Sequence, residues 1–309
     1  MKKFIINLSL ITCLAIIIVS VLVVLPGIRD DYSMIYDTKV KKIQTLSSPK
    51  LVLMGGSSVA FGYNTKVLSD SLHINAYNFG VTSEFGQKYI IEDISRFLKK
   101  GDILVVSLEY ITFLKGDGIY GCKTEMCELL FRNKYVNWPS LNWNQVMVAV
   151  SGLPLICQTN LKRIVSPQST NDSYFHYTKL GFNEFGDEDS HLNLLPTMNP
   201  VLERNNFELL SINKEFTEYY ASQLKKIADR GVKVVCLPGM MGESEYSYEK
   251  NYILRFISLW KDYGGSIDGT VDDYIVPDDF LFDYPYHMNK KGVAYITQTS
   301  LKDIQSSLN

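Results

Sequence analysis

Apolar runs of strand length alternate with longer segments of helical periodicity from residue 50 to the end of the chain. The run "KLVLMGG" is typical of a buried strand, because it is short, apolar and stopped by glycine. Segment 84–101 has apolar residues at helical spacing and closes on two lysines and Gly101, a typical helix end. The pattern predicts strands over 50–56, 74–80, 102–110, 232–239 and, more weakly, 273–283. It predicts helices over 65–72, 84–101, 206–233, 248–265 and 290–308.

This alternation of strands and helices predicts the α/β fold class. Continuously apolar strands are expected where helices cover both faces of a parallel sheet. Functional sites of such sheets lie at the carboxyl ends of the strands. The segment "GGSS" and the pair Glu109–Tyr110 both follow predicted strands.

The N-terminus carries an apolar stretch from Phe4 to Leu25 without a charge. It reaches the ~20 residues that a membrane-spanning helix needs. Because Lys2 and Lys3 precede it, the positive-inside rule places the N-terminus in the cytoplasm. We expect an uncleaved single-pass signal anchor over residues 1–26 and an extracytoplasmic domain. A cleaved signal, or a lipidated one at Cys13, is the alternative.

Residues 27–49 form a polar segment that we interpret as a stalk, followed by one domain over residues 50–309. Within that domain, residues 111–205 are rich in turn formers and poor in periodicity. They are too long for a plain loop. We expect an insertion that caps the strand ends and binds substrate; a purely structural excursion is the alternative.

Composition and charge narrow the classes of protein to which the chain could belong. A hydrophobic fraction of 46% argues against disorder, and a net charge of -2 argues against a nucleic-acid binder. We expect no cofactor and no metal. The five-residue spacing of Cys122 and Cys127 allows a disulfide in an oxidising compartment or two unpaired thiols.

A serine nucleophile needs a base, and the chain has 4 histidines to supply one. His287 stands between the last predicted strand and the last helix, with Asp283 four residues upstream, close enough on a turn to orient the imidazole. His73 is expected at the surface, and His176 lies in the insertion. His191 follows the acidic run 187–189, which we interpret as a solvated loop, with a weak cation site as the alternative.

The stretch "GSSVAFG" resembles the first block of the SGNH (GDSL-type) hydrolase superfamily, Gly-Asp-Ser with a glycine four residues on. Gly56, Ser58 and Gly62 match it, and Ser57 replaces the aspartate, as in the membrane-anchored branch of the family. The resemblance implies a flavodoxin-like three-layer fold with Ser58 as nucleophile and Ser57 as a supporting neighbour. The block "FDYPYHMN" then implies His287 as base.

In this last block, the resemblance makes Asp283 the acid. The spacing from Asp283 to His287 is one residue longer than the family's, which leaves Asp278 and Asp279 as reserves.

The middle blocks of the family supply oxyanion donors, and the match is weaker there. Asn78 and Gly80 fit the second block, but Ser83 stands where the donor glycine is expected. The third block's asparagine is missing, since the strand ends on Glu109 and Tyr110. Tyr110 could donate through its hydroxyl, whereas an ionised Glu109 could not.

Together, the anchor and the resemblance imply an extracytoplasmic serine esterase or O-acyltransferase that acts on acyl groups of a bacterial cell-envelope polysaccharide. The implied partners are the glycan or an acyl-carrying substrate and a multispanning membrane acyltransferase. The alternative from another class is a catalytically degenerate accessory or glycan-binding protein of the same system. A lipid esterase would use the same triad.

Overall fold

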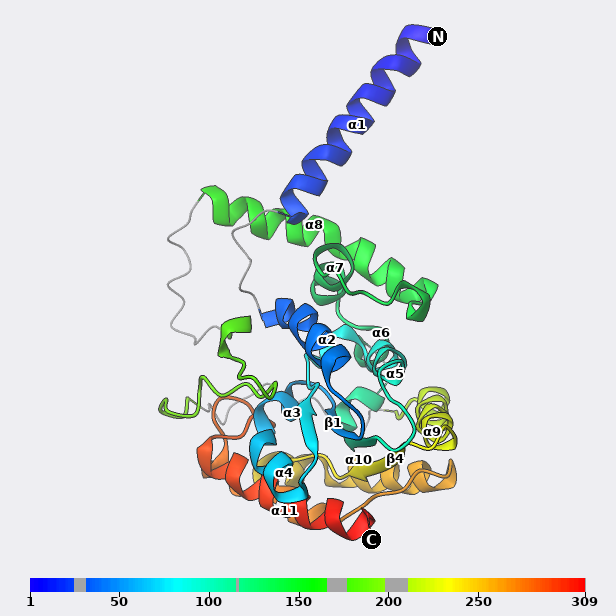
Figure 1. Cartoon of the computed structure of the whole chain (residues 1–309). Coiled ribbons are helices and arrows are strands. Elements are labelled where there is room, and N and C mark those ends of the chain that lie inside the picture. The colour runs from blue at the N-terminus through cyan, green and yellow to red at the C-terminus, as the bar shows by residue number, and fades with distance from the viewer. Residues whose placement is uncertain (25–31, 115–116, 166–176, 198–210, 309) are drawn as a thin grey trace.

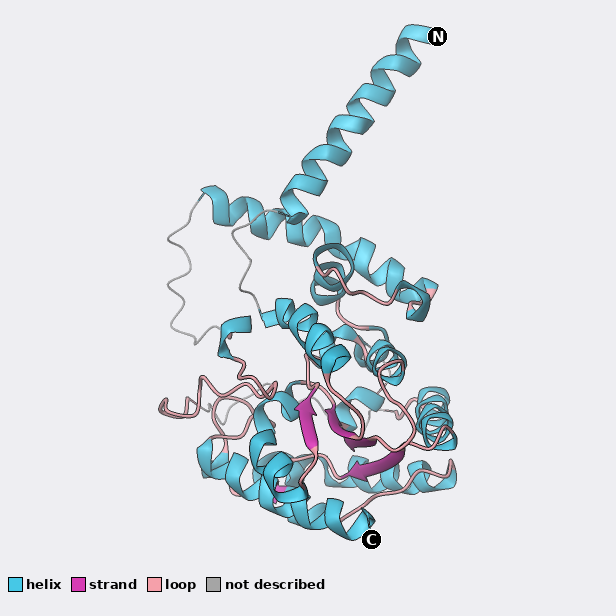
Figure 2. Cartoon of the chain, viewed as in Figure 1, coloured by secondary structure: helices cyan, strands magenta, loops and turns pink. Residues whose placement is uncertain are grey.

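The structure is a computed structural model that describes residues 1–24, 32–114, 117–165, 177–197 and 211–308. Its centre is a parallel sheet in the order β2-β1-β3-β4, with a small parallel pair, β5-β6, beside it (Figures 1 and 2). The strands are β1 (Lys50–Met54), β2 (Asn75–Asn78), β3 (Ile103–Ser107), β4 (Lys233–Leu237), β5 (Met241–Gly242) and β6 (Ile275–Val276). The predicted α/β class with helices around a parallel sheet is confirmed.

Helices cover both faces of the sheet, and every residue of β1 and β3 is therefore buried. Val52 and Leu104 face one apolar cluster, and Leu53 and Val105 face the other. The first cluster is completed by α2 (Ile35–Thr45), α5 (Gln87–Ser95), α9 (Lys214–Asp229) and α10 (Glu243–Asp262). The second is completed by α3 (Ser57–Gly62), α4 (Thr65–Leu72) and α11 (Lys290–Leu308).

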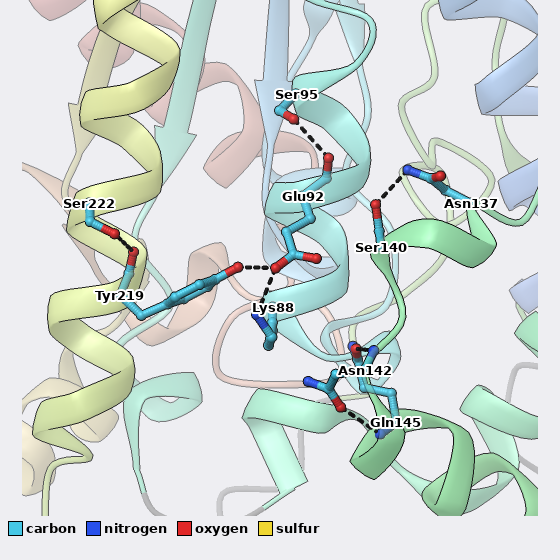
Figure 3. A network of polar contacts seen from close by, with 9 residues as sticks. All are labelled: Lys88, Glu92, Ser95, Asn137, Ser140, Asn142, Gln145, Tyr219 and Ser222. Carbon is cyan, nitrogen blue, oxygen red and sulfur yellow. Dashed lines mark hydrogen bonds and ion pairs between the residues drawn. The ribbon is translucent and has the colours of Figure 1, made fainter.

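Helices α5 and α9 are joined by a polar network at the edge of the first cluster (Figure 3). Glu92 accepts a hydrogen bond from the Tyr219 hydroxyl and pairs with Lys88 at 2.6 Å. The Lys88 ammonium also lies 3.7 Å from the centre of the Tyr219 ring. These contacts hold α5 in register with α9, and α5 follows the loop that borders the candidate site.

The short helical turns that connect these elements are η2 (Tyr32–Met34), η3 (Ser83–Phe85), η4 (Tyr110–Phe113), η5 (Trp138–Ser140), η6 (Lys179–Gly181), η8 (Val271–Tyr274) and η9 (Asp278–Phe280). Two of them, η3 and η4, directly follow the ends of β2 and β3, so they bring residues 83–85 and 110–113 to the carboxyl edge of the sheet.

The segment predicted as a stalk differs from that expectation where it is described. Residues 35–45 form α2, and Tyr36, Val40 and Ile43 lie in the first apolar cluster. The helix is amphipathic, but its lysines make the segment look polar in sequence. The folded domain therefore begins before residue 50.

The predicted insertion divides into two parts. Residues 117–165 form α6 (Asp117–Tyr120), α7 (Lys123–Arg132) and α8 (Trp143–Val165), and α8 lies across the end of α1 (Lys2–Val24) (Figure 1). Residues 177–197 instead lie beside α3, where Glu188 N–H donates to the Ala60 carbonyl at 2.9 Å. This second part borders the strand ends, as a cap should, and so do residues 111–113 of η4 at the start of the insertion.

Helix α1 projects from the rest of the molecule, and its side chains are exposed over nearly its whole length (Figure 1). It is long and apolar enough to cross a membrane. It touches the folded domain at its last residues: Val23 packs against Cys127 and Ile156. Cys127 is therefore a buried thiol, and no bond joins it to Cys122 in the described structure. Cys122 precedes α7, whereas Cys127 is buried within that helix.

Candidate active site

The two serines of "GGSS" begin α3 directly after β1. Positions 55 and 56 have no room for a side chain. A Cβ on Gly55 would lie 2.3 Å from Val59, and one on Gly56 would lie 2.3 Å from the Glu109 carboxylate. The backbone therefore passes close to the end of β3. Ser57 is partly exposed, whereas Ser58 is only 3% exposed.

Glu109 is the direct partner of Ser58. The Ser58 hydroxyl donates to Glu109 Oε1, and the backbone N–H groups of Ser58 and Gly56 also donate to this carboxylate. Gln87 Nε2 adds a weaker contact at 3.4 Å. Burial raises the pKa of Glu109 above the usual glutamate range, and the hydrogen bonds only partly oppose that rise. The Glu109 carboxylate thus accepts from the Ser58 hydroxyl and from the N–H groups of Ser58 and Gly56.

Asp283 and His287 form the pair that the sequence predicts. His287 Nδ1 lies 2.9 Å from Asp283 Oδ1, and the Tyr177 hydroxyl donates to Asp283 Oδ2 at 2.5 Å. Burial raises the pKa of Asp283, but the hydrogen bonds from His287 and Tyr177 outweigh it and the pKa is lowered. An ionised Asp283 fixes the imidazole with Nδ1–H toward the carboxylate, which leaves Nε2 to act as base.

The reserve acids do not serve this histidine. Asp278 accepts hydrogen bonds from Ser244, and Asp279 forms an exposed ion pair with Lys291. Asp283 is the carboxylate that reaches His287.

The His287 ring is held by stacking on Phe61 of α3, with ring centres 4.1 Å apart and planes within 8°. It borders a cavity of about 480 Å³ together with Ser57, Ser83 and Tyr177. A smaller cavity of about 140 Å³ is lined by Ser58 and Glu109. Ser57, Ser83 and Tyr284 line both, so the two cavities adjoin each other and together make up the candidate cleft. Ser57 shares the larger cavity with His287.

Asn78 and Gly80, which match the second block of the family, form hydrogen bonds within the protein. The Asn78 amide donates to the Val59 carbonyl at 2.8 Å, and its oxygen accepts the Gly80 N–H at 2.7 Å. Gly80 N–H is therefore not the oxyanion donor that the resemblance implied. Ser83 remains at the wall of both cavities.

A buried lysine supports this loop. Lys39 of α2 is fully buried and donates to the carbonyls of Asn78, Gly80 and Gly186 at 3.0, 2.5 and 2.7 Å. Its three ammonium protons thus have three acceptors. Burial lowers the pKa of Lys39 to about 7, although the charges of Asp187 and Glu188 oppose this. Lys39 ties the β2 loop to the second part of the insertion.

The acidic run 187–189 is not the solvated loop predicted. Asp187 and Glu188 are buried, and Asp187 accepts from Thr65 and Asn78. Glu188 lies 2.6 Å from His191 Nδ1, and His191 Nε2 lies 2.8 Å from the Met288 carbonyl. These groups bind the insertion to α4 and to the residue next to His287. The prediction failed because acidic runs are usually solvated, and these carboxylates find donors only in the tertiary structure.

The remaining predicted residues lie as follows. Tyr110 is buried, its hydroxyl accepts the Gly239 N–H at 3.2 Å, and the residue lines the smaller cavity. His73 is exposed at the end of α4, as predicted. His176 lies outside the described residues.

Among the described residues, one group has its ligand atoms close enough together to hold a metal ion. The donor atoms of Glu84, Cys122 and Glu125 lie within 4.8 Å of one another. Burial raises the pKa of Glu125 to about 7. Acidic groups often cluster in this way without a metal, so the group alone does not indicate a metal site.

Sequence reasoning missed the roles of Phe61, Tyr177, Lys39 and Glu109. Phe61 lies inside "GSSVAFG", where a helix beginning at Ser57 would have placed it one turn from the serines. Lys39 sits on the apolar face of α2, a pattern visible in sequence. Nothing in the sequence around Tyr177 indicates its contact with Asp283.

No protein-family model matches this chain, and no match is found among curated proteins.

Proposed function

We propose that the protein is a membrane-anchored, extracytoplasmic serine esterase or O-acyltransferase acting on a cell-envelope polysaccharide, with an SGNH-like three-layer domain. One observation carries the proposal: His287, bonded to Asp283, lines the same cavity as Ser57, and Ser57 also lines the adjoining cavity that contains Ser58. A histidine oriented by a carboxylate next to a serine is the arrangement of acyl chemistry.

In the proposed reaction, a serine hydroxyl attacks the acyl carbonyl and its proton passes to His287 Nε2. His287 then protonates the departing sugar oxygen. Water, or a second sugar hydroxyl, attacks the acyl-enzyme, which gives hydrolysis or transfer. The resemblance assigns the attack to Ser58. The position of Ser57 on the wall of the same cavity as His287 supports Ser57 as the competing nucleophile.

Glu109 takes the place of the missing asparagine donor. A neutral carboxylic acid carries an O–H donor, which an ionised one lacks. Because burial raises the pKa of Glu109, the neutral form extends to higher pH than for an ordinary glutamate. In the proposal, neutral Glu109 donates to the oxyanion and releases the N–H groups of Ser58 and Gly56.

A fluorophosphonate probe tests the proposal on the full-length protein in detergent. We expect wild-type labelling that is lost in either Ser57→Ala or Ser58→Ala, which identifies the nucleophile. Ser71→Ala, at an exposed serine of α4, is the matched control and should label normally. Labelling that persists in both variants would place the reactive group elsewhere and reject the proposal. Release of acetate rather than long-chain fatty acid from envelope extracts would separate a glycan substrate from a lipid.

The second candidate is an accessory or glycan-binding protein without turnover. It is favoured by the hydrogen bonds that already join Glu109 to Ser58 and Gly56, since an ionised Glu109 would block the oxyanion position. Absence of labelling in folded wild-type protein, with polysaccharide binding by calorimetry that survives Ser57→Ala and Ser58→Ala, would establish this candidate.

The compartment is tested by topology. Alkaline phosphatase fused after Asn309 should be active, because that enzyme matures outside the cytoplasm. A cytoplasmic reporter at the same place should then be silent, and the reverse result would reject the proposed orientation.

A further inference from the structure

Helix α8 carries an apolar stripe along the face that turns away from the protein. Its members are Trp143, Met147, Val150, Pro154, Leu161 and Val165, all exposed. Their separations of three, four or seven residues keep them on one side of a helix with 3.6 residues per turn. Trp143 is 73% exposed and Val165 is 75% exposed, so the stripe runs from one end of α8 to the other.

The opposite face of α8 is fixed to the domain. Gln145, Ala149, Gly152 and Ile156 are buried there. A Cβ on Gly152 would lie 2.1 Å from the Lys123 carbonyl, so α7 and α8 pack in close contact at this point. The start of α8 is fixed by reciprocal bonds between Asn142 and Gln145 at 3.0 and 2.9 Å (Figure 3). The exposed stripe therefore belongs to a rigidly held helix.

The same helix lies at the end of α1. Asn160 donates to the Leu22 carbonyl at 2.6 Å, and Val23 packs against Ile156. Figure 1 shows α8 lying across this end of α1, between α1 and the sheet. If α1 spans a bilayer, its last residues lie at the level where the chain leaves the membrane, and α8 lies at that level too.

We infer that α8 is an interfacial helix that lies in the plane of the bilayer spanned by α1, with its apolar stripe in the boundary between lipid headgroups and acyl chains. Interfacial helices place an apolar face with Trp or Leu into this boundary and keep a polar face outside. A continuous exposed apolar surface of this kind marks an interaction site. Its continuity with α1 identifies the lipid surface as the occupant. The inference depends on α1 spanning the membrane and is independent of the serine chemistry.

Tryptophan quenching tests the inference on the full chain in nanodiscs that hold one copy each. In a Trp138→Phe background, the emitters are Trp143 on the stripe and Trp260, which is buried. We expect brominated phosphatidylcholine to quench most of the Trp143 emission, and aqueous acrylamide to have little effect. Met147→Trp in a Trp138→Phe, Trp143→Phe chain should behave in the same way. Trp260 emission reports folding in each variant.

The matched control is Leu254→Trp in that double-Phe chain, at a 51% exposed leucine on α10. Acrylamide should quench this tryptophan and brominated lipid should not. Quenching of positions 143 and 147 by acrylamide but not by lipid would overturn the inference. Shielding of those positions that arises only in discs holding two copies would assign the stripe to a second copy and would also overturn it.

Discussion

The two sides of the candidate cleft differ in what their polar groups face. On the base side, the Tyr177 hydroxyl donates to Asp283, and Asp283 bonds to His287 Nδ1, which leaves Nε2 of His287 for the cleft. On the serine side, the Ser58 hydroxyl and the N–H groups of Ser58 and Gly56 are directed at Glu109, a group of the protein itself. In the proposed reaction, the base side would accept a proton, whereas the serine side holds Glu109 where a substrate oxyanion would form. Under that proposal, the charge state of Glu109 controls activity.

The largest expected effect is on the base side. His287→Ala removes the proton acceptor, and general-base catalysis contributes about 10²–10⁴-fold. We expect the rate of fluorophosphonate labelling to fall by that order. The control His73→Ala removes an exposed histidine and should label at the wild-type rate. A His287→Ala rate equal to wild type would show that the two sides of the cleft do not act together.

The next effect is on the serine side. Glu109→Gln and Glu109→Asn put an amide donor where the carboxylate stands, and one oxyanion donor is worth about 10²–10³-fold. We expect both variants to label faster than wild type at pH values above the raised pKa of Glu109, where its carboxylate is ionised. The surface variant Glu215→Gln should be unchanged.

The pH profile carries the sharper test of Glu109. Its pKa is raised, so the neutral donor form predominates below that pKa and is lost as pH rises through it. The labelling rate of the wild-type protein should therefore fall as pH rises through this pKa. The labelling rate of Glu109→Gln should not show this fall. Identical profiles for the two proteins would remove Glu109 from the proposed mechanism.

The strands and the pair Asp283–His287 could be predicted because their signals are local. "KLVLMGG" and "DILVVSLEY" are continuous apolar runs, and a buried strand at the centre of a parallel sheet needs nothing else. Four residues on one turn bring Asp283 to His287. The contact between Ser58 and Glu109 joins two strand ends 51 residues apart, and depends on side-chain orientations that no local pattern specifies.

Two helices were missed for a different reason. The lysines of α2 suggested a solvated stalk, although Lys39 is buried and donates hydrogen bonds to three carbonyls. The turn formers around α8 suggested a cap of poor helical periodicity, and the exposed apolar stripe of α8 breaks the usual polar-outside pattern. In both helices, the tertiary surroundings reverse what residue type alone favours.

Lys39 supports the serine side through Asn78 and Gly80, and its loss should mainly affect stability. Lys39→Met leaves three buried carbonyls without their donor, which we expect to cost about 3 kcal/mol. Thermal unfolding in detergent measures this, with the exposed Lys41→Met as the control. A variant as stable as wild type would show that the loop is held without Lys39.

The pH dependence of stability follows from the lowered pKa. Folded Lys39 loses its proton above about pH 7, whereas the unfolded chain keeps it up to the ordinary lysine range. The unfolded state thus binds more protons between these limits, and stability gains from this group as pH rises through that window. Below about pH 7 the cost of burying the charge is fully present. The gain should be missing in Lys39→Met and retained in Lys41→Met.

The smallest effect is expected at Tyr177, which acts on the base side through Asp283. Tyr177→Phe removes the hydrogen bond to Asp283 Oδ2 but keeps the ring against Phe61, whose centre is 4.6 Å away. A typical hydrogen bond contributes about 1 kcal/mol net, which corresponds to about a fivefold slower labelling rate. Tyr135→Phe, at an exposed tyrosine, is the control. A loss as large as that of His287→Ala would mean that Tyr177 contacts the substrate itself, and no loss would mean that His287 alone orients Asp283.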